Sequence, residues 1–468
     1  MLRNIILLAV ALLCSEAAAQ TWLPSYFSNH MVLQQNEEVS IWGKDDPRTK
    51  VTVTGSWGAE ASVQSDKNGK WKVRLQTLAA GGPYTLTVKG SEEIVLNDIL
   101  FGEVWFCSGQ SNMQMSMKGY NNQPINGSNE QILRSKNDKI RMFSVTREAS
   151  MEPLDDVTGE WQKAAPATTG NFSAVAYFFG KQIHEVTGMP VGLIHSSWGG
   201  SRAEAWMDPE ALSAFPEISL PEQMPENRPN HTPTLLYNAM LHPFIGYTMK
   251  GAIWYQGESN REQASQYETL FPAMIQSWRG HWEQGNFPFY FVQIASYRYD
   301  GAEEVSSAFL REAQLNSMLN TENSGMAVTM DIGECDCIHP AEKNLVGKRL
   351  AYWALANDYK IEGIMANGPV YKQMEITDNG EVKITFDHLD NGLSFFGNAP
   401  EGFEVAGDDK VFHPAQAKIN GDRTLSVWSE NVPAPVAVRY AFKNCSEGTL
   451  YNTAGLPASS FRTDDWEQ

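Results

Sequence analysis

The sequence predicts an α/β protein with a doubly wound parallel sheet and flanking β-sandwich-like domains. Three features support this prediction. Apolar runs typical of buried strands end in polar or glycine-rich segments, helix-like stretches lie between them, and short alternating runs occupy both ends of the chain. Strands that alternate with helices form parallel sheets, because a parallel connection needs a long crossover that a helix usually supplies.

Four apolar runs provide the expected strands of the parallel sheet. Each enters a polar segment: Val104–Cys107 before Ser108–Asn112, Val191–Ser197 before Trp198–Ser201, Gly251–Tyr255 before Gln256–Asn260, and Met326–Ile332 before Gly333–His339. The carboxyl ends of such strands lie at one edge of the sheet, where loops expose side chains on a rigid support. We therefore expect the four polar segments to meet there.

Three stretches have the apolar spacing of helices. They are Phe172–Val186, Gln263–Trp282 and Ala341–Leu355. The first ends at Gly188, and glycine is the usual residue just after a helix. The third follows Pro340, which we expect at the first helical position because proline is favoured there.

Ser111 is the candidate nucleophile, since it lies in the turn that follows the first strand. A serine hydroxyl needs a base to take its proton, and a carboxylate usually orients that base. His339 has an acid, Asp336, nearby in its polar segment. It also precedes a predicted helix, whose dipole favours the neutral imidazole that a base requires. We predict a triad of Ser111, His339 and Asp336, although an ordinary turn and a helix-capping histidine are compatible with the same residues.

An acyl-transfer site also needs hydrogen-bond donors for the oxyanion of the tetrahedral intermediate. The candidates are the backbone N–H of Ser111, a glycine N–H from Gly199 or Gly200, and the side-chain amide of Gln256. A glycine suits this role because the backbone must come close to the substrate.

Substrate-binding candidates adjoin these residues. They are Trp198, Arg202, Asn112 and Glu258. Tryptophan offers an aromatic face to a sugar ring, and a guanidinium can pair bidentately with a carboxylate. Arg202 has the alternative of an ion pair with the neighbouring Glu204.

The cysteines favour neither a metal nor a firmly assigned disulfide. Cys335 and Cys337 form a Cys-x-Cys pair without the second pair that a zinc site would show, so we expect no metal. A disulfide between Cys107 and the Cys335 segment fits an oxidising compartment, although spacing does not establish it.

Several blocks of the chain together resemble the sialate O-acetylesterases, a carbohydrate-esterase branch of the SGNH-type hydrolases. The blocks are GQSNM around Ser111, WGGSRAEAW over Trp198–Trp206, WYQGESN over Trp254–Asn260, the Asp336-x-x-His339 pair, VLQQ from Val32, and the tail Leu450–Asp464. The similarity covers nearly the whole chain, and four ordered blocks together are specific where one alone is weak.

The resemblance implies an SGNH-type esterase that removes O-acetyl groups from sugars, in the first place from O-acetylated sialic acid, through an acetyl-serine intermediate and without a cofactor. It places Gln256 in the oxyanion role, with Asn260 in reserve. Related members often carry aspartate where this chain has Cys337. Asp331, Glu334 or a serine–histidine dyad therefore remain alternatives to Asp336 as the orienting acid.

Two other functions remain open. The first is an acetyl xylan or other plant-glycan esterase, which would use the same machinery. The second is a non-catalytic carbohydrate-binding protein whose β domains bind the glycan. The net charge of −19 argues against a nucleic acid partner. The sequence does not indicate an oligomeric state.

The 468-residue chain is long enough for more than one domain. We predict a signal peptide over 1–19, an N-terminal β-sandwich over 20–98, the SGNH-type α/β esterase domain over 99–365 and a C-terminal β-rich region over 366–468. The first segment has a basic start, an apolar middle and a small-residue end, so we expect export to the periplasm or medium without membrane insertion.

Overall fold

A 17-residue strand, β7 (Glu93–Gly109), connects the N-terminal β region with the α/β part of the chain in the computed structural model, which describes residues 20–466. Its first half pairs with β1 (Val32–Gln34) and β6 (Gly81–Lys89). Its second half pairs with β10 (Val191–Ser197) and β11 (Gly251–Tyr255). The expected boundary between residues 98 and 99 therefore falls inside one continuous strand.

The central sheet has the strand order β13-β12-β11-β7-β10-β8-β9. The remaining strands are β8 (Asn137–Ser144), β9 (Trp161–Ala164), β12 (Phe289–Val292) and β13 (Ser324–Ala327). All neighbours are parallel except β8 and β9. The chain fills one side of β7 first and then crosses to the other, so the strand order reverses beside β7. The carboxyl end of β7 is thus the switch point at which α/β proteins place their ligands.

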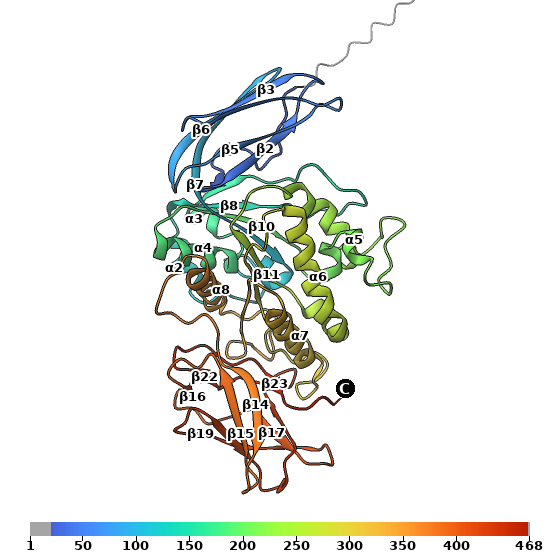
Figure 1. The fold of residues 1–468 in the computed structure, drawn as a ribbon, viewed down its shortest axis with the longest axis vertical. Helices are drawn as coiled ribbons and strands as arrows, with labels where there is room; N and C mark the ends of the chain where they lie inside the picture. The colour runs from blue at the N-terminus through green and yellow to red at the C-terminus, as the bar shows by residue number, and fades with distance from the viewer. Residues whose placement is uncertain (1–19, 467–468) are drawn as a thin grey trace, which may run out of the picture.

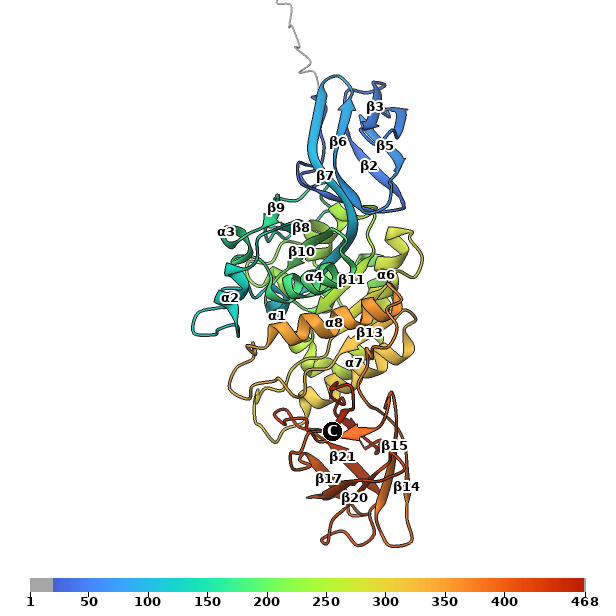
Figure 2. The ribbon, with the colours of Figure 1, turned by 90° about the vertical axis from the view of Figure 1, so that its left-hand side faces the viewer.

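Helices cover both faces of this sheet, which confirms the predicted parallel α/β fold (Figures 1 and 2). Helices α4 (Ala174–Thr187) and α8 (Lys343–Asn357) pack on one face, and α6 (Ala264–Trp282) and α7 (Ser306–Asn320) on the other. Because side chains alternate along a strand, Trp105 packs on α4 while its neighbour Phe106 packs on Trp278 of α6.

Three local expectations were wrong. Helix α8 begins at Lys343, so Pro340 lies ahead of the helix and not at its first position. His339 therefore precedes the first helical residue by four positions, beyond the short range over which a helix dipole acts. The strand expected over Met326–Ile332 is also shorter: β13 ends at Ala327. From there to the helix, the chain is irregular except for turns and an isolated bridge.

The shorter helices connect the layers. They are α1 (Ser111–Gln114), α2 (Ser128–Leu133), α3 (Pro166–Thr169), α5 (Pro209–Leu212), η1 (Ala203–Trp206), η2 (Pro229–His231), η3 (Tyr237–Leu241), η4 (His242–Phe244) and η5 (Glu258–Gln263). Within residues 20–466, no helix combines the length and the hydropathy needed to cross a membrane. The expected signal peptide, 1–19, lies outside the described residues.

Antiparallel sheets lie on either side of the α/β part, as predicted (Figure 1). The N-terminal region pairs β2 (Glu38–Lys44) with β5 (Lys70–Gln76), and joins β3 (Lys50–Gly55) and β4 (Glu60–Gln64) to β6. The C-terminal sheets are β14 (Val370–Ile376), β15 (Val382–Asp387), β20 (Leu425–Trp428) and β19 (Gln416–Ile419); β18 (Phe412–Pro414), β17 (Phe403–Ala406), β21 (Ala437–Tyr440) and β23 (Phe461–Arg462); and β16 (Leu393–Ser394) with β22 (Tyr451–Asn452).

Candidate active site

Ser111 lies at the switch point, as the first residue of the short helix α1 directly after β7. Gly109 ends the strand with a φ of 138°, and a Cβ there would come within 2.2 Å of the Tyr255 carbonyl oxygen. Only glycine allows both this backbone conformation and this approach. The Trp198 amide donates to the Gly109 carbonyl at 3.1 Å, which joins the exit of β10 to the same turn. Three of the predicted polar segments therefore meet at Ser111.

The imidazole of His339 is oriented by an amide rather than by a carboxylate. Its Nδ1 lies 2.8 Å from Oε1 of Gln123. An amide oxygen can only accept, so Nδ1 carries the proton and Nε2 keeps the lone pair of a general base. Burial, with a further contribution from Lys343, lowers the pKa of His339 to about 4. The histidine is therefore neutral at pH 7, for a reason other than the expected helix dipole.

Tyr120 connects the histidine with the serine. Its ring packs edge-on against His339, with the ring centroids 5.1 Å apart. Its hydroxyl donates to the backbone carbonyl of Ser111 at 3.0 Å. One aromatic side chain thus contacts both residues of the predicted pair.

Asn112 forms a second connection between the two segments. Its Nδ2 donates to the Ile338 carbonyl at 3.0 Å and to Oε1 of Glu258 at 2.6 Å. Its Oδ1 accepts from Nζ of Lys343 at 2.5 Å. The residue after Ser111 is therefore bonded to the residue before His339. We call Glu258, Asn112 and Lys343 the polar bridge.

The charges in the polar bridge are buried. Burial lowers the pKa of Lys343 to about 7 and raises the pKa of Glu258. The second carboxylate oxygen of Glu258 has no hydrogen-bond partner within residues 20–466. Asn112 is fully buried and joins the loops, so its side chain is not placed for the expected substrate contact. Glu258 is only partly buried, and its substrate contact stays a prediction.

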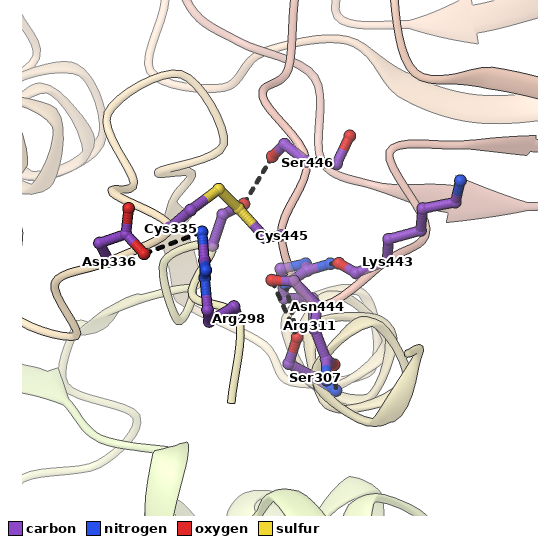
Figure 3. Close-up of a disulfide and its surroundings, with 10 residues drawn as sticks. Arg298, Ser307, Arg311, Cys335, Asp336, Lys443, Asn444, Cys445 and Ser446 are labelled. Carbon is purple, nitrogen blue, oxygen red and sulfur yellow. Dashed lines mark hydrogen bonds and ion pairs between the residues drawn. A yellow bond between two sulfur atoms is a disulfide. The ribbon is translucent and has the colours of Figure 1, made fainter. Parts of the chain in front are cut away.

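The expected contact between Asp336 and His339 is absent from the described structure. Asp336 pairs with Arg298 at 2.8 Å, and its side chain is 80% exposed (Figure 3). The alternatives are also engaged elsewhere: Asp331 pairs with Arg349 at 2.6 Å, and Glu334 accepts from the Ala341 amide at 2.7 Å. Each of these three acids has a closer partner, so none of them orients the histidine.

A disulfide between Cys335 and Cys445 attaches the His339 segment to the C-terminal β region (Figure 3). The adjacent residue Ser446 accepts through its carbonyl from the hydroxyl of Ser296 at 2.6 Å. The suggested partner Cys107 is wrong, because its side chain is buried between the sheet and α4/α8 and remains a free thiol in the described chain. Sequence spacing gave no means of choosing Cys445.

Some of the expected oxyanion donors are already bonded within the described part of the chain, and others are not. The amide of Gln256 is buried and donates to Asn260 Oδ1 at 2.7 Å and to the Ser201 carbonyl at 3.1 Å. The reserve candidate Asn260 donates to Glu204 at 2.8 Å. Both side chains therefore support the loops and are not free donors at Ser111.

Of the two glycines, Gly199 has its N–H bonded within the protein, whereas Gly200 has no such bond within residues 20–466. The Gly199 N–H donates to Oε1 of Gln114 at 2.6 Å, and an added Cβ would lie 3.3 Å from Cβ of Ser111. Gly200 adopts a φ of 72°, which favours glycine. The backbone N–H groups of Ser111 and Gly200 are the predicted donors that remain.

Trp198 and Arg202 lie on the neighbouring surface. Trp198 is half-buried, and the guanidinium of exposed Arg147 lies 5.7 Å from its ring centroid. Arg202 is partly exposed and lies 3.7 Å from Oε1 of Glu204, the alternative partner expected from the sequence. Neither Arg147 nor the orienting Gln123 was predicted. Lys343 was also missed, although it continues the buried face formed by Val346 and Leu350 in α8.

A serine at the switch point of a parallel sheet, near a neutral histidine, suits ester hydrolysis, and the comparisons place the chain among the carboxylic ester hydrolases that act on carbohydrates. The family model "Carbohydrate esterase, sialic acid-specific acetylesterase" matches residues 102–356. Sialate O-acetylesterase from Mus musculus is 32% identical over 98% of this chain and 97% of that protein. The Homo sapiens protein of the same name is 32% identical over 77% of this chain and 76% of that protein.

A solved structure agrees with this comparison. The crystal structure of a carbohydrate acetylesterase from Xanthomonas citri superposes with a TM-score of 0.88 at 38% identity, over 96% of this chain and 100% of that chain. The chain belongs to the sialate O-acetylesterase family, which confirms the resemblance found in its motifs.

Proposed function

We propose that the chain is a serine esterase that removes O-acetyl groups from sugars, with O-acetylated sialic acid as its main substrate. The observation that carries the proposal is the placement of Ser111 at the switch point, connected through Tyr120 and Asn112 to the segment of a neutral His339. The full-length similarity to sialate O-acetylesterases supports the choice of substrate.

The proposed reaction has two steps. Ser111 Oγ attacks the acetyl carbonyl while Nε2 of His339 takes its proton, and the oxyanion accepts from the backbone N–H of Ser111 and Gly200. His339 then protonates the leaving sugar oxygen. Water attacks the acetyl-serine, with His339 again as the base, and acetate leaves. Gln123 keeps Nε2 free for these proton transfers.

Substrate recognition is proposed for the surface beside Gly200. Trp198 offers a half-buried ring to the sugar, and Arg202 carries a guanidinium toward the carboxylate that distinguishes sialic acid from neutral sugars. Arg147 is a second cation beside Trp198, and it lies near enough to Tyr120 to oppose the rise in the pKa of that phenol. Each guanidinium is a candidate partner for the carboxylate of an acidic glycan.

A plant-glycan esterase is the second candidate, because the similar Xanthomonas citri structure is described only as a carbohydrate acetylesterase. A purely glycan-binding role is disfavoured, since a binding protein has no need of a serine at the switch point and an oriented neutral histidine.

The test is acetate release from O-acetylated sialic acid and from acetylated xylo-oligosaccharide, measured side by side with the chain from Gln20 and with its Ser111→Ala variant. We expect release with a preference for the sialic acid, and loss of at least about a thousandfold in the variant. Preference for the acetylated xylo-oligosaccharide would indicate that plant glycans are the substrate. Substantial turnover by Ser111→Ala would overturn the serine mechanism.

Arg202→Ala and Arg147→Ala separate carboxylate recognition from general packing. We expect each substitution to raise KM for the sialic acid and to leave KM for the neutral xylo-oligosaccharide nearly unchanged. An equal effect on both substrates would contradict a role in recognising the carboxylate.

We further propose that the chain is exported to the periplasm or medium with cleavage before Gln20. The Cys335–Cys445 disulfide supports this, because disulfides persist mainly in oxidising compartments. N-terminal sequencing of the protein recovered from the periplasmic and medium fractions tests it, and an intact Met1 in the cytosolic fraction alone would contradict it.

A further inference from the structure

A pocket of about 340 Å³ lies at the junction of the N-terminal β region and the α/β part, away from Ser111. It is lined by three tryptophans and three lysines: Trp22, Trp42, Trp71, Lys44, Lys70 and Lys72. The lining residues come from the chain start, from β2 and β5, and from loops that hold Asp155 and Ile245. None of them belongs to the site built around His339.

The pocket has more positive than negative charge. Asp155 pairs with Lys44 at 2.7 Å and with Lys70 at 3.5 Å. Among the residues described, Lys72 has no acidic partner, and its ammonium lies 5.8 Å from the ring centroid of Trp42. The chain as a whole carries a net charge of −19, so the excess of lysine over acidic residues in this pocket is opposite in sign to the overall charge. The Lys72 cation favours an anionic ligand.

The tryptophans provide aromatic ring faces to the pocket. Trp22 and Trp42 are partly exposed, and Lys44 lies 5.2 Å from the Trp22 ring centroid. Trp71 is only 4% exposed, and its Nε1–H has no hydrogen-bond partner in the described chain. This N–H is buried, so the ring faces of Trp22 and Trp42 are what the tryptophans offer to a ligand.

We propose that this pocket binds a sugar unit that carries a carboxylate, as a second glycan site apart from the catalytic one. The apolar face of the sugar packs on Trp42 and Trp22, and its carboxylate pairs with Lys72. Sialic acid and a uronic acid of a plant glycan share this chemistry. The inference requires only that the chain meets acidic glycans, and it does not depend on which of them is deacetylated.

Binding is measured by calorimetry with the Ser111→Ala chain, so that no ligand is consumed. The probes are sialyllactose, a glucuronic acid-substituted xylo-oligosaccharide and unsubstituted xylohexaose. We expect at least one acidic probe to bind and xylohexaose to bind about tenfold more weakly or not at all. Equal binding of acidic and neutral probes, or no binding of either acidic probe at millimolar concentration, would overturn the proposal.

Two variants locate the binding. Lys72→Met, added to Ser111→Ala, is expected to weaken the binding of the acidic probe about tenfold or more. Lys50→Met on β3 serves as a matched control and is expected to leave the binding unchanged. Trp42→Phe keeps an aromatic face and is expected to retain part of the binding that Trp42→Ala loses. Unchanged affinity in Lys72→Met would overturn the assignment, whatever the folding of the tryptophan variants.

The second site is separated from catalysis by one further measurement. With Ser111 intact, Lys72→Met is expected to hydrolyse a small acetate ester at the parent rate. A fall in this rate together with the fall in binding would show that the probe binds at the catalytic site, and would overturn the proposal. A chain that binds acidic glycan normally yet hydrolyses no ester would instead refute only the proposed esterase function.

Discussion

The segments that carry Ser111 and His339 face each other but are held in different ways. The serine segment follows β7 within two residues, and backbone hydrogen bonds from the exits of neighbouring strands fix it. The histidine segment is irregular, and side chains from distant parts of the chain hold it: Gln123, Asn112, Arg349 and the disulfide to Cys445. The sheet positions the proposed nucleophile, whereas long-range cross-links position the proposed base.

Among the contacts that hold the two segments, the polar bridge should give the largest effect when it is broken. Lys343→Met leaves the Asn112 oxygen and buried Glu258 without their cation, so Asn112, which is bonded to the Ile338 carbonyl, loses one of the contacts that hold it in place. We expect kcat to fall about a hundredfold, as for a displacement of about 1 Å at the reacting groups. Steady-state kinetics measures this, with Lys348→Met in the same helix as the control. Equal kinetics of the two variants would contradict a positioning role.

Replacing Gln123, whose side-chain amide orients His339, should give the next largest effect. Gln123→Ala frees His339 to turn and to change its protonated nitrogen, so we expect kcat to fall about thirtyfold, less than loss of the base itself. Gln123→Glu restores an acceptor and adds a negative charge. It should raise the pKa of His339 and shift the acid limb of the pH–rate profile to higher pH. An acid limb at the same pH in Gln123→Glu and in the parent would contradict the hydrogen bond between Gln123 and His339.

The covalent anchor can be removed by replacing Cys335 and Cys445 with serine. The bond closes a loop with a sequence separation of 110, so its loss should cost about 2–4 kcal/mol of unfolding free energy. We expect kcat to fall about tenfold, because the disulfide lies only four residues before His339. Chemical denaturation and kinetics test both effects. Cys337→Ser, which leaves the disulfide intact, is the control and should retain both properties.

The pH dependence follows from the depressed pKa of His339. Burial lowers this pKa from its usual value to about 4, so the neutral base persists as the pH falls from 7 to 5. Protonation removes the lone pair, so kcat/KM should be halved near pH 4 and fall about tenfold for each further unit, provided the fold survives. A limb near pH 6.5 would show that the histidine is more solvated than in this structure.

The smallest effect should come from Asp336. It lies on the surface in an ion pair with Arg298, and exposed pairs contribute little. Asp336→Asn should therefore change kcat less than about threefold, whereas loss of an orienting acid in a serine–histidine–aspartate triad costs about ten-thousandfold. A loss near the larger value would reinstate Asp336 as the orienting acid.

The fold was largely predictable because its main signals are local. Strands β10 and β11 match the predicted runs at both ends, since each is a buried apolar segment with a clear polar exit. Helix α7 was not predicted because its buried side includes Ser307, Arg311 and Gln314, which obscures the apolar periodicity.

The candidate site was predictable only in part. The positions of Ser111 and of the His339 segment both follow from the rule that the loops at the carboxyl ends of parallel strands carry the chemistry. The partner of the imidazole does not, because Gln123 comes from a region without a regular pattern, more than 200 positions earlier in the chain. Proximity in sequence favoured Asp336, but an exposed arginine supplied a better partner for that carboxylate.

The shared strand β7 has a consequence for how this architecture can be recombined. Its residues up to about Gly102 belong to the sheet of the N-terminal region, and those that follow form the middle of the catalytic sheet. A graft joined at residue 98 would cut this strand and replace half of it with a foreign segment. The N-terminal region is therefore not an exchangeable module, and a chimaera with a different N-terminal domain should keep all of β7 together with β1 and β6.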